Sequence, residues 1–86
     1  MSKVTIVTGG SRGIGAATAK LLASHGHAVC VNYLSNADAA SKVVSEIEAA
    51  GGRALAVQAD TSVEADVMRM FETVDKELGT LTGLVN

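Results

Sequence analysis

Hydrophobic residues along the chain form short continuous runs, separated by longer segments in which they recur every three or four positions. The runs predict buried strands, and the longer segments predict amphipathic helices. The predicted strands cover 4–7, 27–33, 53–59 and 81–86. The first and third predicted helices cover 14–25 and 63–78. The second helix lies between them, is capped by Ser35 or Asn36 and is ended by Gly51. Alternating strands and helices predict an α/β fold with a parallel sheet and right-handed crossovers.

Each predicted helix has a hydrophobic side that can lie on the sheet. In the first helix this side consists of Ile14, Ala17, Thr18, Leu21, Leu22 and His25. In the second it consists of Ala37, Ala40, Val44 and Ile47. In the third, which has the clearest pattern, it consists of Val63, Val67, Met70, Phe71, Val74 and Leu78. In front of this third helix, Thr61 and Glu64 have the spacing of a capping box.

A glycine-rich stretch, Thr8-Gly9-Gly10-Ser11-Arg12-Gly13-Ile14-Gly15, joins the first predicted strand to the first helix. The free backbone N–H groups and the positive dipole end of a helix bind anions at such a junction. Gly9 permits the tight turn, Gly13 lets a diphosphate approach the backbone, and Gly15 lets the helix lie close to the sheet. The stretch therefore predicts a phosphate-binding turn.

Two other glycine motifs fit this stretch less well. Gly10 and Gly15 have the separation found in a nucleoside triphosphate-binding loop, but Ala16 and Ala17 stand where that loop has Lys and Ser or Thr. The common Gly-x-Gly-x-x-Gly dinucleotide motif is also absent, because the order is Thr-Gly-x-x-x-Gly-x-Gly counted from Thr8. A glycine-rich turn that binds nothing is the remaining alternative.

The ends of the predicted strands favour NADP over NAD as the dinucleotide. An NAD site has an acidic residue about twenty positions after the glycines, which binds the ribose hydroxyls. The corresponding positions here are Asn32-Tyr33-Leu34-Ser35, without a carboxylate. Arg12 supplies a cation for a ribose phosphate, and Asn32, Tyr33 and Ser35 can donate hydrogen bonds to it. Each of these residues has a plainer alternative role, Arg12 as a solvated loop cation and the others as an ordinary strand end.

Composition narrows the possible functions. The chain has 86 residues with a net charge of -2, and its seven basic residues are scattered, which argues against a nucleic-acid partner. No stretch is long enough to span a membrane, and no signal peptide is expected. The single cysteine, Cys30, fits a cytoplasmic protein. His25, His27 and Cys30 lie close in sequence but match no standard zinc spacing, so no metal site is expected.

The glycine stretch, with Ser11 and Arg12 inside it, resembles that of the short-chain dehydrogenase/reductase family. The resemblance extends over the whole chain and is greatest to members related to 3-oxoacyl-carrier-protein reductase and glucose 1-dehydrogenase. It implies a Rossmann-type doubly wound parallel sheet, of which four strands and three helices form the first half. Ala59-Asp60-Thr61-Ser62 matches the family's acidic site that binds adenine, with a helix cap as the less favoured role of Asp60. Leu84-Val85-Asn86 matches the start of a Leu-Val-Asn-Asn-Ala-Gly signature and implies that Asn86 approaches the cofactor ribose.

The cofactor-binding residues thus expected are Gly9, Ser11, Arg12, Gly13, Ile14, Gly15, Asn32, Tyr33, Ser35, Asp60, Thr61 and Asn86.

The same resemblance implies chemistry that these residues do not supply. The family reduces carbonyl groups beside a catalytic Ser, Tyr and Lys, with the Lys four positions after the Tyr. The only tyrosine is Tyr33, and Ala37 stands four positions later. We therefore expect a cofactor-binding domain over 1–86 that is truncated before the catalytic part. The full-length protein is expected to be a homo-oligomer that acts on a small carbonyl or alcohol; a non-catalytic dinucleotide-binding module, or a fragment that needs a complementary segment, is the alternative.

Overall fold

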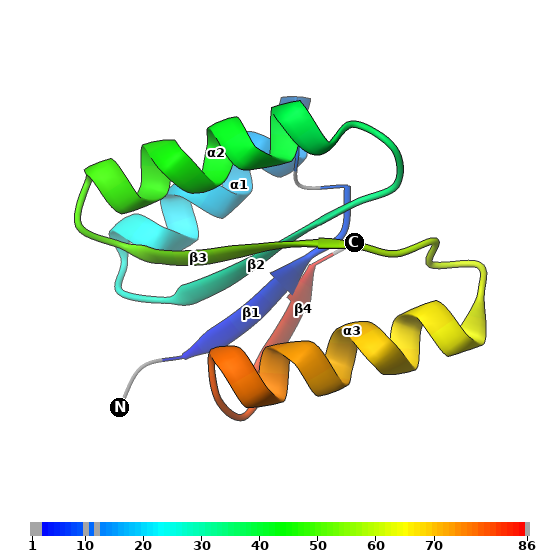
Figure 1. Cartoon of the computed structure of the whole chain (residues 1–86). Helices are drawn as coiled ribbons and strands as arrows, with labels where there is room; N and C mark the ends of the chain where they lie inside the picture. Colours follow the sequence, from blue (N-terminus) through cyan, green and yellow to red (C-terminus); the bar gives the residue numbers. More distant parts are fainter. Residues whose placement is uncertain (1–2, 10, 12, 86) are drawn as a thin grey trace.

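A single sheet of four parallel strands forms the centre of the computed structural model, which describes residues 3–9, 11 and 13–85. In chain order the elements are β1 (Val4–Val7), α1 (Gly13–Ser24), β2 (Ala28–Tyr33), α2 (Ala37–Ala49), β3 (Arg53–Gln58), α3 (Glu64–Glu77) and β4 (Gly83–Val85). The strands lie in the order β3-β2-β1-β4, with β1 between β2 and β4 (Figure 1). This topology confirms the predicted α/β fold and its half-sheet of four strands and three helices.

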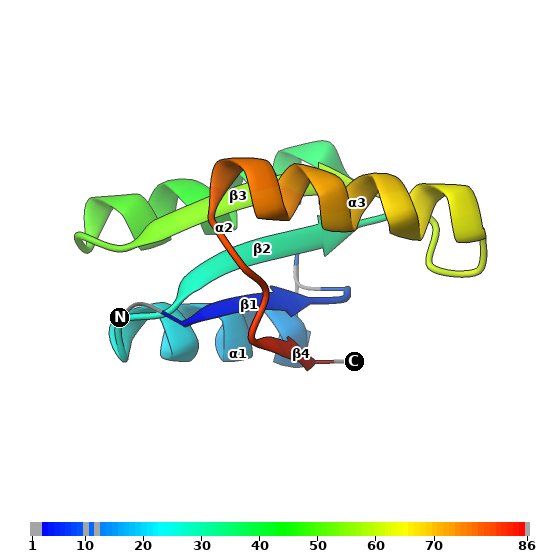
Figure 2. The same ribbon diagram turned by 90° about the horizontal axis from the view of Figure 1, so that it is seen from below.

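The helices cover the two faces of the sheet unequally. Figure 1 shows α1 and α2 above the sheet and α3 below it. Figure 2 looks onto the face that α3 covers, where no helix of the described part of the chain lies in front of β4. Leu84, at the centre of β4, is accordingly exposed.

Alternation along the strands divides the core into two layers. Ile6 and Cys30 point to the α3 side and pack with Met70 and Val74 of that helix. The opposite side chains pack against α1 and α2 in a cluster formed by Val7, Ala19, Val29, Val31, Ala40, Val43 and Ile47. Because β1 and β2 supply side chains to both layers, they are buried almost along their whole length, as their continuous hydrophobic runs predicted.

The buried side of α1 differs from the predicted one. Ile14 is 87% exposed and Leu21 is also exposed, whereas Ala19 is fully buried. The side that faces the sheet consists of Ala16, Ala19, Leu22 and Ala23. Small alanine side chains let the helix approach the sheet closely, and a pattern that ranks residues by hydrophobicity alone underrates them. The prediction of an inward-facing Ile14 and Leu21 was therefore wrong.

The predicted starts of α2 and α3 have different outcomes. Asn36 caps α2, because its Oδ1 accepts a hydrogen bond from the Ala39 amide at 3.0 Å. The capping box of Thr61 and Glu64 is absent, since α3 begins after Val63 without a side-chain cap. The turn before α3 is instead held by Asp60, whose carbonyl oxygen accepts from the Val63 amide at 2.9 Å.

Burial of Cys30 gives a pH-dependent prediction. Burial raises the pKa of the thiol from 9.0 to about 12, so the folded chain keeps it protonated when the unfolded chain has lost the proton. Unfolded chains then bind fewer protons, and the free energy of unfolding is expected to fall above pH 9, by up to about 1.4 kcal/mol per pH unit. Urea titrations from pH 8 to pH 11 measure this slope. The Cys30→Ala variant is the control, because it keeps every other titrating group; equal slopes in both proteins would contradict the prediction.

Candidate functional site

A cavity of about 270 Å³ opens at the carboxyl edge of the sheet. Its lining comes from the ends of three neighbouring strands and consists of Thr8, Gly9, Asn32, Leu34, Ala59, Asp60 and Thr61. The structure thus brings together Gly9, Asn32 and the neighbouring pair Asp60 and Thr61, which come from three separate parts of the sequence and were predicted to bind the cofactor. Carboxyl edges of parallel strands are where α/β folds bind ligands.

The glycine turn at this edge has the backbone that glycine allows. Gly9 and Gly13 have φ angles of 63° and 62°, a region that other residues rarely adopt. Gly13 is the first residue of α1, and a Cβ atom built on it would have no heavy atom of the described residues within 4 Å, apart from the adjacent residues and the backbone of α1 itself. The requirement for glycine at position 13 therefore comes from the backbone angle and not from crowding within the chain. Open space beside the first amides of a helix is suited to an anion.

The remaining residues predicted in the turn have varied surroundings. Gly15 lies in the first turn of α1 and is half-buried, in keeping with close helix packing, and Ser11 is also half-buried. Ile14 is exposed beside the turn, so any contact with a ligand would come from its exposed side chain or its backbone. Gly10 and Arg12 lie outside the described residues, as does Asn86 after β4.

Asn32 forms the floor of the cavity. Its side chain is only 3% exposed, and its Oδ1 accepts a hydrogen bond from the Gly9 amide at 3.4 Å. Its Nδ2 donates to the carbonyl oxygens of Ala59 at 3.1 Å and Val57 at 3.4 Å. Both amide hydrogens are thus engaged within the protein. Asn32 lies where it was predicted, but its amide group joins the strand ends and is not available as a donor to a ribose phosphate.

Tyr33 and Ser35 follow at the end of β2. The Tyr33 side chain packs with the core layer under α1 and α2, on the side of the sheet away from α3. Its carbonyl oxygen accepts from the Ala59 amide at 3.0 Å and so holds the end of β3. Ser35 is exposed in the bend before α2. Of these two side chains, Ser35 is the one that is free of core packing and accessible to a ligand.

Asp60 presents a charged carboxylate at the cavity. Its Oδ1 accepts from the backbone amide and the hydroxyl of Ser62, at 2.9 and 2.6 Å. These two hydrogen bonds lower the pKa of Asp60 below its usual value, the side-chain bond contributing most. The Asp60 amide in turn donates to Asp66 Oδ2 at 3.0 Å. Asp60 therefore remains an acceptor at neutral pH, and it is part of a turn before α3 without being the N-cap of that helix.

Leu34 is a lining residue that the sequence analysis missed. It is 59% exposed at the end of β2, and its carbonyl oxygen accepts from Gln58 Nε2 at 3.1 Å. An exposed leucine on a polar cavity offers an apolar surface to a flat ligand group. The signal was present in the sequence, since Leu34 interrupts a run of polar residues at a predicted ligand-binding edge.

A second, smaller hollow of about 160 Å³ shares Thr8 and Thr61 with the cavity. Its other lining residues are apolar and come from α3 and β4: Val67, Met70, Phe71 and Leu84. Thr8 marks the boundary between the two spaces, and its amide and hydroxyl both donate to the Val85 carbonyl oxygen, at 2.8 and 3.1 Å. The polar cavity thus continues into an apolar surface toward β4.

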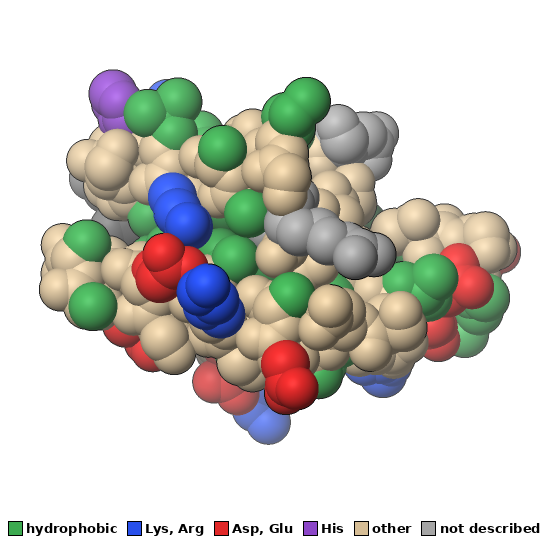
Figure 3. All heavy atoms as spheres, turned by 90° about the horizontal axis from the view of Figure 1, so that it is seen from above, with side chains coloured by type: hydrophobic (Ala, Val, Ile, Leu, Met, Phe, Trp, Pro, Cys, Tyr) green, Lys and Arg blue, Asp and Glu red, His purple; other side chains and the backbone are tan. Residues whose placement is uncertain are grey.

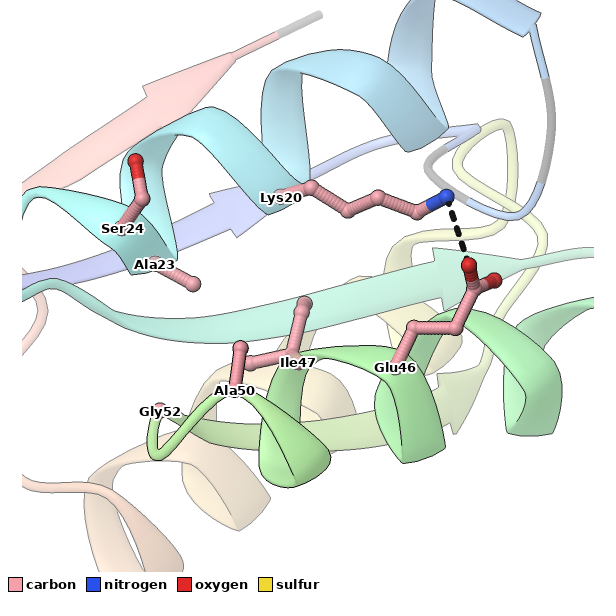
Figure 4. A pocket seen from close by; sticks show the side chains of 7 residues that line it. All are labelled: Lys20, Ala23, Ser24, Glu46, Ile47, Ala50 and Gly52. Carbon is pink, nitrogen blue, oxygen red and sulfur yellow. Dashed lines mark hydrogen bonds and ion pairs between the residues drawn. The ribbon is translucent and has the colours of Figure 1, made fainter.

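A larger hollow, of about 390 Å³, lies away from this edge, between α1 and α2. Figure 4 shows its lining, with Lys20 reaching across to Glu46 above Ala23 and Ile47. The Lys20 Nζ and Glu46 Oε2 atoms are 3.1 Å apart, and both side chains are about half exposed. Figure 3 shows charged side chains of both signs beside one another on this face. A solvated ion pair over small apolar side chains offers few convergent polar groups, so this hollow is a poorer ligand site than the carboxyl edge.

Among residues 3–9, 11 and 13–85, no group of three or more His, Cys, Asp or Glu side chains could hold a metal ion. His27 is instead close to Thr5, with 3.0 Å between Nδ1 and the threonine hydroxyl. None of the helices among residues 13–77 has the length and apolar character needed to cross a bilayer.

Comparison with known sequences gives matches over nearly the whole chain. Residues 3–86 match the sequence profile described as short chain dehydrogenase. The oxidoreductase YgfF of Escherichia coli is 51% identical over 96% of the chain, and a 3-oxoacyl-[acyl-carrier-protein] reductase of Synechocystis is 45% identical over 99%. The chain spans about a third of the length of both relatives. It spans 79% of another relative, the short-chain dehydrogenase/reductase homolog YusS of Bacillus subtilis, with 42% identity over the whole chain.

Solved structures share the fold as well as the sequence. A dehydrogenase/reductase from Sinorhizobium meliloti covers the whole chain with a TM-score of 0.95 and 48% identity. A short chain dehydrogenase from Burkholderia cenocepacia in complex with NADP covers 98% of it with a TM-score of 0.92 and 48% identity. The chain corresponds to 34% of each of those chains. At this similarity, the four strands and three helices match the first half of the larger folds.

Proposed function

Because this chain belongs to the short-chain dehydrogenase/reductase family, we propose that it binds NADP(H) at the carboxyl edge of its sheet, as the cofactor-binding part of an oxidoreductase. The observation that carries the proposal is the open glycine turn at the start of α1, next to a cavity that ends at Asp60. Backbone amides of the turn would hold the diphosphate, and Asp60 would accept from the adenine amino group. Leu34 would contact the adenine ring, and Thr61 would line the same pocket.

Charge supports NADP over NAD. Asp60 is the one carboxylate among the lining residues, and the end of β2 supplies Asn32, Tyr33, Leu34 and Ser35 without an acid that would repel a ribose phosphate. Arg12, which the sequence places in the glycine turn, would add the matching positive charge. The Burkholderia relative bound to NADP agrees with this assignment.

The cofactor would supply the hydride that passes to a carbonyl carbon, or that is taken from an alcohol in the reverse direction. This chain's own residues would bind and orient it: Gly9 and Gly13 at the diphosphate, Ser35 at the ribose phosphate, and Asn86 near the second ribose. No Tyr-x-x-x-Lys pair occurs in the sequence. We therefore assign the proton transfers of the reaction to residues other than those of 1–86. Residues 1–86 are proposed to form part of the cofactor-binding site only.

A second candidate function is a dinucleotide-binding module that performs no chemistry by itself. The similarity to YusS favours it, because the chain spans most of that relative and only a third of the others. Saturable binding of NADPH, without carbonyl reduction by the same protein, would distinguish the module from the reductase.

Removing the turn cation tests the cofactor assignment. Arg12→Ala is expected to weaken NADPH binding about tenfold while changing NADH binding less than about twofold, because only NADPH has the ribose phosphate. Fluorescence titration of the chain with each nucleotide measures both dissociation constants. Lys20→Ala is the control, since it removes one positive charge from α1 whose partner is Glu46 and not the cavity. If neither nucleotide binds the unaltered chain, or if Arg12→Ala lowers both affinities equally, the proposal of an NADP site is overturned.

A further inference from the structure

We propose that Asn32 is a positioning residue, whose side-chain amide fixes the distance between the diphosphate-binding turn and the adenine-binding end of the cavity. The inference rests on the proposed NADP(H) site and deepens it. Asn32 would act through its hydrogen bonds with Gly9 and Ala59, whereas the sequence analysis expected it to contact the ribose phosphate directly.

The three hydrogen bonds of Asn32 span the ends of three strands. Gly9 follows β1, Asn32 itself belongs to β2, and Ala59 follows β3. These strands lie side by side in the order β3-β2-β1, so the amide crosses the width of the cavity floor. Movement of the turn relative to the end of β3 would break at least one of these bonds.

An asparagine amide has the required chemistry at this position. The Gly9 N–H needs an acceptor, and the carbonyl oxygens of Val57 and Ala59 need donors. A carboxylate at position 32 would offer no donor and would bury a charge, and a leucine would offer neither donor nor acceptor. With 3% of its surface exposed, Asn32 has little access to the solvent that could otherwise replace these partners.

The two ends of the cavity depend on Asn32 to different extents. The end of β3 has further support, because the Ala59 amide donates to Tyr33 and the Asp60 amide donates to Asp66. Arg69 Nη2 also donates to the Gln58 carbonyl oxygen at 2.7 Å. On the other side of the cavity, Thr8 is anchored to Val85 by its amide and hydroxyl, and the next residue, Gly9, donates its amide to Asn32. Loss of the Asn32 amide is therefore expected to displace the turn from Gly9 onward while the adenine end keeps its place.

This asymmetry makes the role measurable with a whole ligand and a fragment. NADP contacts both ends at once and gains affinity only if their spacing is right. Adenosine, which lacks the ribose phosphate assigned to Arg12 of the turn, reaches only the adenine and ribose end. In Asn32→Leu, which keeps a similar volume, NADP affinity is expected to fall about tenfold or more, and the affinity for adenosine is expected to stay within about twofold.

Thr82→Val is the matched control. The Thr82 hydroxyl also joins two strands, since it accepts from the Val4 amide at 2.9 Å and donates to the Val4 carbonyl oxygen at 3.1 Å. It does so at the opposite edge of the sheet, so its loss should leave both affinities unchanged. Asn32→Ser, which retains a small polar group too short for the span, serves as the second variant if Asn32→Leu does not fold.

Hydrogen exchange at the Gly9 amide tests the same inference without a ligand. Exchange is expected to be at least about tenfold faster in the Asn32 variants than in the unaltered chain, and unchanged in Thr82→Val. Unaltered Gly9 exchange in the Asn32 variants would overturn the positioning role, as would an equal loss of affinity for NADP and adenosine. Failure of the unaltered chain to bind NADP would instead refute the proposed function, and the exchange measurement would still decide the role of Asn32.

Discussion

Replacing Gly13 with alanine is expected to lower the affinity for NADP(H) by about 10- to 100-fold, the loss expected when hydrogen bonds to a charged group are removed. The added methyl group would occupy the open space beside the first turn of α1, where, apart from the adjacent residues and the backbone of α1 itself, no heavy atom of the described residues lies within 4 Å. The φ angle of 62° also becomes unfavourable for a residue with a side chain, so the turn would shift as well. Isothermal titration with NADPH measures the effect.

Gly51→Ala separates the effect of a methyl group in the nucleotide site from the effect of backbone strain. Gly51 also has a positive φ, 89°, and open space around its Cβ position, but it lies after α2 and outside the cavity lining. Both variants are expected to destabilise the chain by about 1–3 kcal/mol through backbone strain, while only Gly13→Ala weakens nucleotide binding. Equal nucleotide affinity in the two variants would show that the glycine turn does not bind the diphosphate.

Met70→Ala is expected to be the most destabilising of the substitutions considered. Met70 is 1% exposed in the core layer between the sheet and α3, and shortening a buried methionine costs about 2–5 kcal/mol. A chain of 86 residues has a total stability of roughly 4–13 kcal/mol, so the variant loses much of its folded population. Urea unfolding followed by circular dichroism measures the loss.

Met68→Ala provides the comparison within the same helix. Met68 is two positions earlier on α3 and 56% exposed, so the same chemical change should alter the free energy of unfolding by no more than about 0.5 kcal/mol. A cost for Met68 similar to that for Met70 would mean that α3 does not lie on the sheet as described.

Sequence patterns were sufficient for the architecture. The continuous runs at β1 and β2 predicted strands buried on both faces, and the glycine turn predicted the start of α1, because these features depend on local composition. Element bounds agreed to within two residues, as for β4, predicted over 81–86 and observed over Gly83–Val85. The α1 face was mispredicted because close packing favours alanine, which hydrophobic periodicity does not detect.

Side-chain roles at the site were harder to predict. The sequence places Asn32 at a ligand-binding edge, but only the three-dimensional neighbours show that Gly9, Val57 and Ala59 already occupy its amide. Asp60 was predicted as an acceptor, and the structure adds that hydrogen bonds from Ser62 hold its carboxylate and lower its pKa below the usual value. Such pairings depend on strand order and register, which no local pattern encodes.

The position of β4 affects when β1 can be paired on both sides. β1 is an interior strand whose second neighbour, β4, comes 78 positions later at the Val4–Thr82 contact. During synthesis β1 can pair with β2 early, but its other side stays unpaired until Gly83–Val85 have left the ribosome. Contacts between such distant segments slow folding. Nascent chains halted before Thr82 should therefore expose an unpaired edge on β1, one of the first strands to be made.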